Sequence, residues 1–277
     1  MKRTFVHKNR HREKSGGGEK YRERYNPMEE DDNKFDAYGL ILFTACACCV
    51  VSTSAALAYV AMGCTGIPFL KCAPTAVISA AFFACSVIAS EDKITASCAR
   101  FAGAAFALVS MGDALLETDR WRLGTVLSCV GQVAMVLAAF ASSRVSRNET
   151  KGTVWRTALC AVSIAIGEVI AVCIARIVSS GSDAMASVPT VIYLITIGAS
   201  GGLGASRWKR MDEAFACIVG AHALQLADSI AMLAFPGKQY LVMITYWMGC
   251  ASTAAAPALF AHRQIKLKMR RDLRSIL

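Results

Sequence analysis

The chain has 277 residues, 55% of them hydrophobic, and a mean hydropathy of +0.43. Soluble domains are usually about 45–50% apolar, and the excess here lies in repeated apolar stretches of about 20 residues, the length that crosses a bilayer as a helix. The net charge of +10 comes from basic residues in the tails and in alternate loops, where they set membrane orientation. Composition and charge therefore exclude a soluble domain, argue against nucleic-acid binding, and favour an all-α polytopic membrane protein.

The first 36 residues form a tail of mixed charge around a glycine run. The tail has little apolar surface to bury, which predicts disorder. The first apolar run begins near Tyr38, behind this long tail, whereas the apolar region of a cleaved signal peptide follows a short basic start. We therefore expect a charged cytosolic tail over residues 1–36 and assign it no chemistry.

A bundle of eight transmembrane helices is predicted within residues 37–262. In chain order the predicted spans are 38–62, 67–89, 94–116, 122–143, 155–178, 184–205, 212–235 and 239–262. Short connections favour antiparallel packing of neighbours, and frequent small residues permit close helix contact in lipid. A basic tail, residues 263–277, follows. The positive-inside rule places both termini in the cytosol, which fits the endoplasmic reticulum or another endomembrane.

An internal repeat relates the two halves of the predicted bundle. The sequence "APTAVI" at residues 73–78 resembles "VPTVIY" at 188–193, so that Pro74 and Pro189 are 115 residues apart. Asp113 and Asp228 are also 115 residues apart. Two landmarks at one offset indicate a four-helix unit that is used twice, with both copies in the same orientation.

Polar side chains from six predicted spans lie at a similar depth. A charged group at mid-bilayer costs roughly 2.5–3.5 kcal/mol, so such groups usually face the bundle interior. At 1.5 Å per residue, these side chains fall within one slab roughly 10 Å thick. They predict a cavity lining, although polar side chains can also simply hold helices together. The six residues are Lys71, Asp113, Gln132, Tyr193, Asp228 and Tyr246.

Three further polar residues lie inside predicted spans. His222 and Asp228 are six residues apart, which separates their directions by about 120° on a helix, so we do not expect them to touch. Gln225 lies three residues from each and is placed to bridge their faces. We interpret His222 as a hydrogen-bonded core residue rather than a catalyst. Glu168 is a further candidate, for structure or for function.

The twelve cysteines lie within or beside apolar runs. No His/Cys set has the spacing of a zinc site. Because buried cysteine behaves as a small hydrophobe, we interpret these residues as packing residues. No metal and no cofactor are predicted.

Several motifs together resemble the YhhN-type membrane family, which includes the animal lysoplasmalogenases. The matching pieces are "FLKCAP", "MGDALLE" with "RWRLG" after it, the Tyr193 segment, "GAHALQLADSIAML" and "ITYWMG". The sequence departs from the family pattern at two positions. Gln132 stands where the family commonly has a histidine, and Cys250 stands where it commonly has a glutamine after the tyrosine of the last span.

The resemblance implies an enzyme that hydrolyses the vinyl ether of a lysoplasmalogen to a fatty aldehyde and a glycerophospho-alcohol. Two carboxyls suit this chemistry: burial keeps one protonated to supply a proton to the vinyl carbon, and the other supports the oxocarbenium ion and activates water. We predict Asp113 and Asp228 as this acid/base pair, without assigning the acid. The predicted substrate-binding residues are Lys71, Gln132, Tyr193 and Tyr246, with Lys71 suited to the phosphate.

Two other classes of protein fit the same pattern. Intramembrane acids and internal duplication are also typical of a transporter or proton-coupled carrier, although these helices lack paired Gly/Pro breaks at mid-span. Gln132 in place of the histidine favours a catalytically inactive lipid-binding homologue. The expected partners are a lysophospholipid substrate and membrane lipids, with no nucleic acid, and the sequence leaves the oligomeric state open.

Overall fold

The computed structural model describes residues 50–63, 68–116, 118, 120–144, 158, 162–167, 169, 173, 184–232 and 237–276. All of them belong to one compact unit, residues 40–277. Every regular element in these ranges is a helix, which confirms the all-α fold class. The predicted tail 1–36, about half of the predicted span 38–62, most of the predicted span 155–178, and Glu168 lie outside the described residues.

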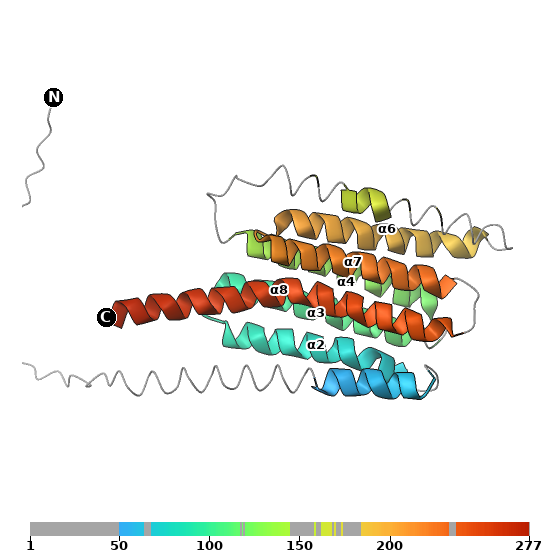
Figure 1. Cartoon of the computed structure of the whole chain (residues 1–277), viewed down its shortest axis with the longest axis horizontal. Helices are drawn as coiled ribbons and strands as arrows, with labels where there is room; N and C mark the ends of the chain where they lie inside the picture. The colour runs from blue at the N-terminus through green and yellow to red at the C-terminus, as the bar shows by residue number, and fades with distance from the viewer. Residues whose placement is uncertain are drawn as a thin grey trace, which may run out of the picture. The chain divides into compact units, whose positions relative to one another are not determined.

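Six long helices form the described bundle (Figure 1). They are α2 (Pro68–Ile88), α3 (Lys93–Leu116), α4 (Trp121–Ser143), α6 (Ala184–Arg207), α7 (Met211–Met232) and α8 (Lys238–Ile276). A shorter helix, Val50–Ala61, precedes them. Apart from the end of α8, the limits of these six helices agree with the predicted spans to within three residues. The length of each apolar run and the charged connections beside it determine both the predicted span and the helix.

The last helix continues well beyond the predicted span 239–262. After Arg263 the chain contains Gln, Ile, Lys, Leu, Met and Arg and neither glycine nor proline before Ile276, and such residues favour helix. Two ion pairs hold this part of α8 against its neighbours: Arg263 pairs with Glu213 of α7, and Lys268 pairs with Glu91, which lies between α2 and α3. The basic residues of the predicted tail therefore extend α8.

Side-chain caps help to position α3. The Asp92 carboxylate accepts hydrogen bonds from the Ile94 amide (3.1 Å) and from the Thr95 hydroxyl (2.6 Å). An aspartate at this position satisfies amides that have no partner within the helix. The charged connection "SEDK", expected as a loop between spans, thus also starts α3.

The order of helix packing creates a central region between five helices. Helices adjacent in sequence pack together within the α2–α3–α4 group and within the α6–α7–α8 group, α4 also packs on α6, and α8 packs on α3. The helices α3, α4, α6, α7 and α8 consequently surround a common centre. Many buried residues are alanines, such as Ala102, Ala105 and Ala138, and small residues allow such close approach.

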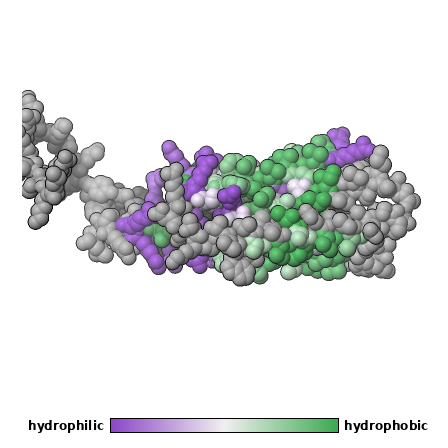
Figure 2. Space-filling view, turned by 90° about the horizontal axis from the view of Figure 1, so that it is seen from above, coloured by the Kyte–Doolittle hydropathy of each residue, from purple (hydrophilic) through white to green (hydrophobic). Residues whose placement is uncertain are grey.

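The outer surface of the bundle is apolar. Among the described residues, four stretches are long and apolar enough to cross a membrane: Leu70–Ile88, Lys93–Leu116, Arg122–Ser143 and Met211–Ala231. Figure 2 shows a band of hydrophobic residues between two hydrophilic regions. Large apolar side chains such as Val87 (72% exposed) and Phe215 (65% exposed) face outward, as expected of a surface in contact with lipid. These observations support membrane insertion through at least these four helices.

Charged helix ends meet at one end of the bundle. The ion pairs Lys268–Glu91 and Arg263–Glu213 join α8 to the start of α3 and to the start of α7. The Arg207 guanidinium lies 4.2 Å from the centre of the Phe140 ring, which joins the last turn of α6 to that of α4. Because the predicted spans cross the membrane in alternate directions, the sequence also places these segments on one side of the membrane.

Candidate functional site

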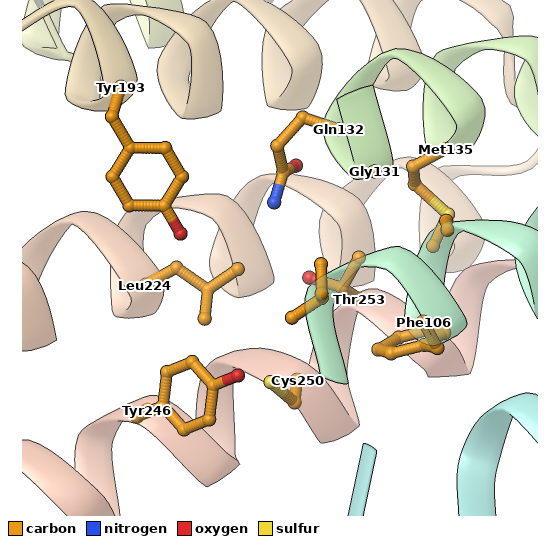
Figure 3. Close-up of a pocket in the computed structure, with 11 residues that line it drawn as sticks. Phe106, Gly131, Gln132, Met135, Tyr193, Leu224, Tyr246, Cys250 and Thr253 are labelled. Atoms are coloured by element: carbon orange, nitrogen blue, oxygen red, sulfur yellow. The ribbon is translucent and has the colours of Figure 1, made fainter. Parts of the chain in front are cut away.

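A small cavity lies where α3, α4, α6, α7 and α8 meet (Figure 3). Its volume of about 20 Å³ provides room for a water molecule but not for an alkyl chain. The apolar part of its wall includes Phe106, Met135 and Leu224. The part that carries amide, hydroxyl or thiol groups is formed by Gln132, Tyr193, Tyr246, Cys250 and Thr253.

The buried aspartate of α3 has a partner on α8. The Tyr246 hydroxyl donates a hydrogen bond to Asp113 Oδ2. Both side chains are buried, Asp113 being 4% and Tyr246 6% exposed. A buried carboxyl without a donor would carry a large desolvation cost, and the tyrosine offsets part of that cost. The hydrogen bond explains how an aspartate is accommodated in an otherwise apolar helix.

The second aspartate lies near the first but has different surroundings. Asp228 is half-buried on α7, and its charge interacts with the charges of Asp113 and Lys71. Tyr193 lies close enough to both aspartates to interact with them. Among the described residues, no donor is hydrogen-bonded to Asp228. The structure thus brings Lys71, Tyr193, Tyr246 and the two aspartates together from five helices.

Both departures from the YhhN pattern face the cavity. The Ser200 hydroxyl of α6 donates to Gln132 Oε1 at 2.8 Å, which links α4 to α6 and leaves the Gln132 amide nitrogen turned toward the cavity (Figure 3). Cys250 lies on the opposite wall, one helical turn after Tyr246. Gln132 therefore lines the cavity, as predicted.

His222 belongs to a structural network outside the cavity. Its Nε2 atom lies 3.2 Å from Ser163 Oγ and its Nδ1 atom lies 2.8 Å from Gln225 Oε1. Gln225 in turn donates to the Leu194 carbonyl at 2.9 Å. These contacts show that His222 is hydrogen-bonded and half-buried. The prediction that Gln225 bridges to Asp228 is wrong, because its amide group bonds to His222 and to the α6 backbone instead.

Two glycines bring α3 and α4 into backbone contact next to Asp113. A Cβ atom on Gly124 would lie 2.7 Å from the Gly112 carbonyl oxygen, and one on Gly112 would lie 2.5 Å from Ser128 Oγ. Real Cβ atoms do not approach backbone so closely. These residues are the glycines of "MGDALLE" and "RWRLG". Their role is to set the distance between the helices and thereby the position of Asp113.

We expect Gly124→Ala to lower the free energy of unfolding by about 1–3 kcal/mol, because the added methyl group must push two backbones apart. The measurement is thermal or denaturant unfolding of the protein in detergent. Gly103→Ala is the matched control, since a Cβ there would meet only the Phe83 ring at 3.2 Å and a side chain moves more readily than a backbone. Equal stability of the two variants would contradict the proposed role of the α3–α4 contact.

Thr253 and Ser200 are not among the site residues predicted from the sequence. Tyr246, Cys250 and Thr253 have the spacing i, i+4, i+7, which places them on one face of a helix. That spacing is the signal that would have indicated Thr253 once Tyr246 was chosen. The contact of Ser200 with Gln132 has no comparable signal, because the two residues are 68 positions apart.

Comparison with known proteins places the chain in a family. The model of the YhhN family matches residues 66–255. No match is found among curated proteins or among solved structures. The matched region begins before α2 and ends within α8, so that it contains the cavity and both intramembrane aspartates. The chain belongs to the YhhN family.

Proposed function

We propose that this protein is an integral membrane hydrolase of the lysoplasmalogenase type, which cleaves the vinyl ether bond of lysoplasmalogens to a fatty aldehyde and a glycerophospho-alcohol. The observation that carries the proposal is the pair of neighbouring intramembrane carboxyls, Asp113 and Asp228; within the described part of the chain, a tyrosine donates a hydrogen bond to Asp113 and none donates to Asp228. Membership of the YhhN family supports it. The proposal includes eight spans, with both termini in the cytosol of an endomembrane.

The proposed reaction needs one carboxyl as an acid and one as a carboxylate. The acid transfers its proton to the vinyl carbon that is not bonded to oxygen, and an oxocarbenium ion forms. Water then adds to the carbon bonded to oxygen while the carboxylate takes a proton from that water. The resulting hemiacetal collapses to an aldehyde and an alcohol, with its hydroxyl proton passing to the departing oxygen. Proton exchange between the two carboxyls restores the starting state.

The internal repeat suggests how the two aspartates divide these roles. Ser110 and Gln225 are 115 residues apart, and each donates to a carbonyl of the preceding long helix, that of Cys72 or Leu194. This similarity supports a duplicated unit. The copies differ, however, at Tyr246, because the residue 115 positions earlier is Gly131. The repeat therefore provides a hydroxyl for only one aspartate.

We assign the carboxylate to Asp113 and the acid to Asp228. A donor hydrogen bond favours the ionised form of a carboxyl. Asp113 has the Tyr246 donor, whereas no donor within the described residues is hydrogen-bonded to Asp228. Lys71, whose charge also interacts with Asp228, is placed to bind the phosphate of the headgroup.

The test is aldehyde release by the purified protein in proteoliposomes that contain a 1-alkenyl lysophospholipid. We expect aldehyde from this lipid and none from the 1-alkyl analogue, which has no vinyl group to protonate. Because the cavity is too small for an alkyl chain, we expect substrate binding to displace its apolar lining, including Met135 and Leu224. Absence of aldehyde together with lipid uptake would indicate a carrier.

A catalytically inactive lipid-binding protein is the second candidate. Gln132 and Cys250 are the two departures from the YhhN pattern, and both line the cavity. The Gln132 amide does not replace the imidazole of the family pattern as an acid or base, and Cys250 cannot provide the amide of the family's glutamine. Saturable binding of the 1-alkenyl lipid without any product would favour this candidate.

We expect Tyr246→Phe to lower the rate of aldehyde release by about tenfold to a hundredfold, because a hydrogen bond to a charged group is worth about 1.5–3 kcal/mol. The ring and its packing remain, and only the donor to Asp113 is lost. Tyr240→Phe is the matched control, since Tyr240 is on the same helix and is exposed. Equal rates for the two variants would show that the hydroxyl has no part in the reaction.

A further inference from the structure

The hydroxyl of Thr253 is buried without a partner. Among the described residues, Thr253 Oγ1 is a buried oxygen that makes no hydrogen bond, and the side chain is 7% exposed. Other helical threonines bond to their own backbone: Thr196 donates to the Ile192 carbonyl at 2.8 Å, and Thr245 donates to the Leu241 carbonyl at 2.7 Å. A hydroxyl that forgoes this local bond in an apolar surrounding needs another ligand.

The neighbouring helix leaves space for this hydroxyl. A Cβ atom on Gly220 of α7 would lie 2.2 Å from Thr253 Oγ1 and 2.6 Å from the Thr253 amide nitrogen. Glycine at this position thus lets α7 and α8 approach at Thr253 without displacing its side chain. The hydroxyl is held at the cavity wall by close packing of the two helices.

The cavity between Thr253 and Gln132 has the properties of a water site. Gln132 and Thr253 both line it, from different walls (Figure 3). Ser200 already occupies Gln132 Oε1, so the amide nitrogen is available as a donor. A buried water needs space of about 10–15 Å³ and two to four polar partners, and the cavity of about 20 Å³ meets the first requirement.

We infer that Thr253 and Gln132 hold a water molecule in this cavity, and that this water is the nucleophile of the hydrolysis; the second part rests on the proposed function. Tyr246 lines the same cavity and donates to Asp113. When the water oxygen bonds to the oxocarbenium carbon, the water gives one proton to the Tyr246 oxygen. Tyr246 gives its own proton to the Asp113 carboxylate. Tyr246 is thus unchanged, and Asp113 becomes protonated.

Gln132 then has a role that does not require the acid or base chemistry of a histidine. The amide only has to donate a hydrogen bond to the water, because Tyr246 and Asp113 accept the proton. Gln132 is then a water-binding residue rather than an acid or base. This assignment is compatible with the neutral amide that distinguishes the chain from the family pattern.

The experiment compares Thr253→Ser with Thr253→Ala. Both variants lose the methyl group, and only the alanine variant also loses the hydroxyl, so their difference isolates the hydroxyl. We expect aldehyde release to be about tenfold to a hundredfold slower in Thr253→Ala than in Thr253→Ser, as for other losses of reactant positioning. We expect only a small difference in unfolding temperature, because the hydroxyl has no partner among the described protein groups and loses only its bond to the water. Thr245→Ser and Thr245→Ala, outside the cavity, form the control pair.

Two outcomes would overturn the inference. One is equal aldehyde release by the two Thr253 variants, and the other is a loss of unfolding temperature in Thr253→Ala that matches its loss of rate, which would indicate a structural hydroxyl. If the unsubstituted protein releases no aldehyde, the proposed function fails, and a high-resolution density map then decides the water site. Density for a water on Thr253 and on its serine replacement, but not on alanine, supports the site; no density in any of them refutes it.

Discussion

Replacement of Asp113 or Asp228 by asparagine is expected to slow aldehyde release from a 1-alkenyl lysophospholipid by a factor of at least about 100, the usual contribution of a positioned acid or base. Asparagine keeps the size of the side chain and can still accept a hydrogen bond from Tyr246. It cannot give or take the proton that the reaction requires. The measurement is the initial rate of aldehyde release by each purified variant.

The double variant makes the test more specific. If the two carboxyls act as one acid/base unit, Asp113→Asn/Asp228→Asn is expected to be about as slow as the slower single variant, since effects within a catalytic unit are not additive. Asp212→Asn is the control, because Asp212 is at the start of α7 and pairs with the exposed Arg210. Rates close to that of the unsubstituted protein in both single variants would rule out the proposed pair.

Replacement of Arg263 by methionine is expected to lower the free energy of unfolding by about 3 kcal/mol, because removal of one partner leaves a buried charge without compensation. Arg263 Nη2 lies 3.1 Å from Glu213 Oε1, and the Glu213 side chain is only 1% exposed. Methionine keeps most of the apolar stem, so the main loss is the charge. Denaturant unfolding in detergent provides the measurement.

A second pair on the same helix is the control for this prediction. Lys268 pairs with Glu91, and their side chains are 53% and 79% exposed. Exposed ion pairs contribute about 0–1 kcal/mol, so Lys268→Met is expected to have little effect. Arg263→Met combined with Glu213→Gln is expected to recover part of the lost stability, because no charge then remains unpaired. A loss in Arg263→Met no larger than that in Lys268→Met would show that burial of Glu213 has no energetic consequence.

The limits of the long helices could be predicted because they depend on local properties. Apolar length and charged connections determine where α2, α3, α4, α6 and α7 begin and end. The extension of α8 past residue 262 was not predicted, since charged residues indicate the end of a membrane span rather than the end of a helix. Favourable helix propensity and the ion pairs of Arg263 and Lys268 continue the helix there.

The sequence by itself determined that Lys71, Asp113, Gln132, Tyr193, Asp228 and Tyr246 lie at similar depth, because rise per residue converts position into height. Only the tertiary structure decided their partners. Tyr246 hydrogen-bonds to Asp113, although the two residues are 133 positions apart; Gln225 bonds to His222 and Leu194 instead of Asp228. Depth is a property of one helix, whereas a hydrogen bond depends on the rotation of two helices about their axes.

Thr253 is the clearest example of the difference between what the sequence determines and what only the tertiary structure decides. Its face on α8 follows from its spacing to Tyr246, and a threonine in an apolar helix is ordinarily bonded to its own backbone. Only the close approach of α7 at Gly220 and the cavity beside Gln132 show that this hydroxyl is buried and has no partner among the side chains and backbone that the structure describes. The absence of a partner depends on every surrounding side chain, so that no pattern along one segment encodes it.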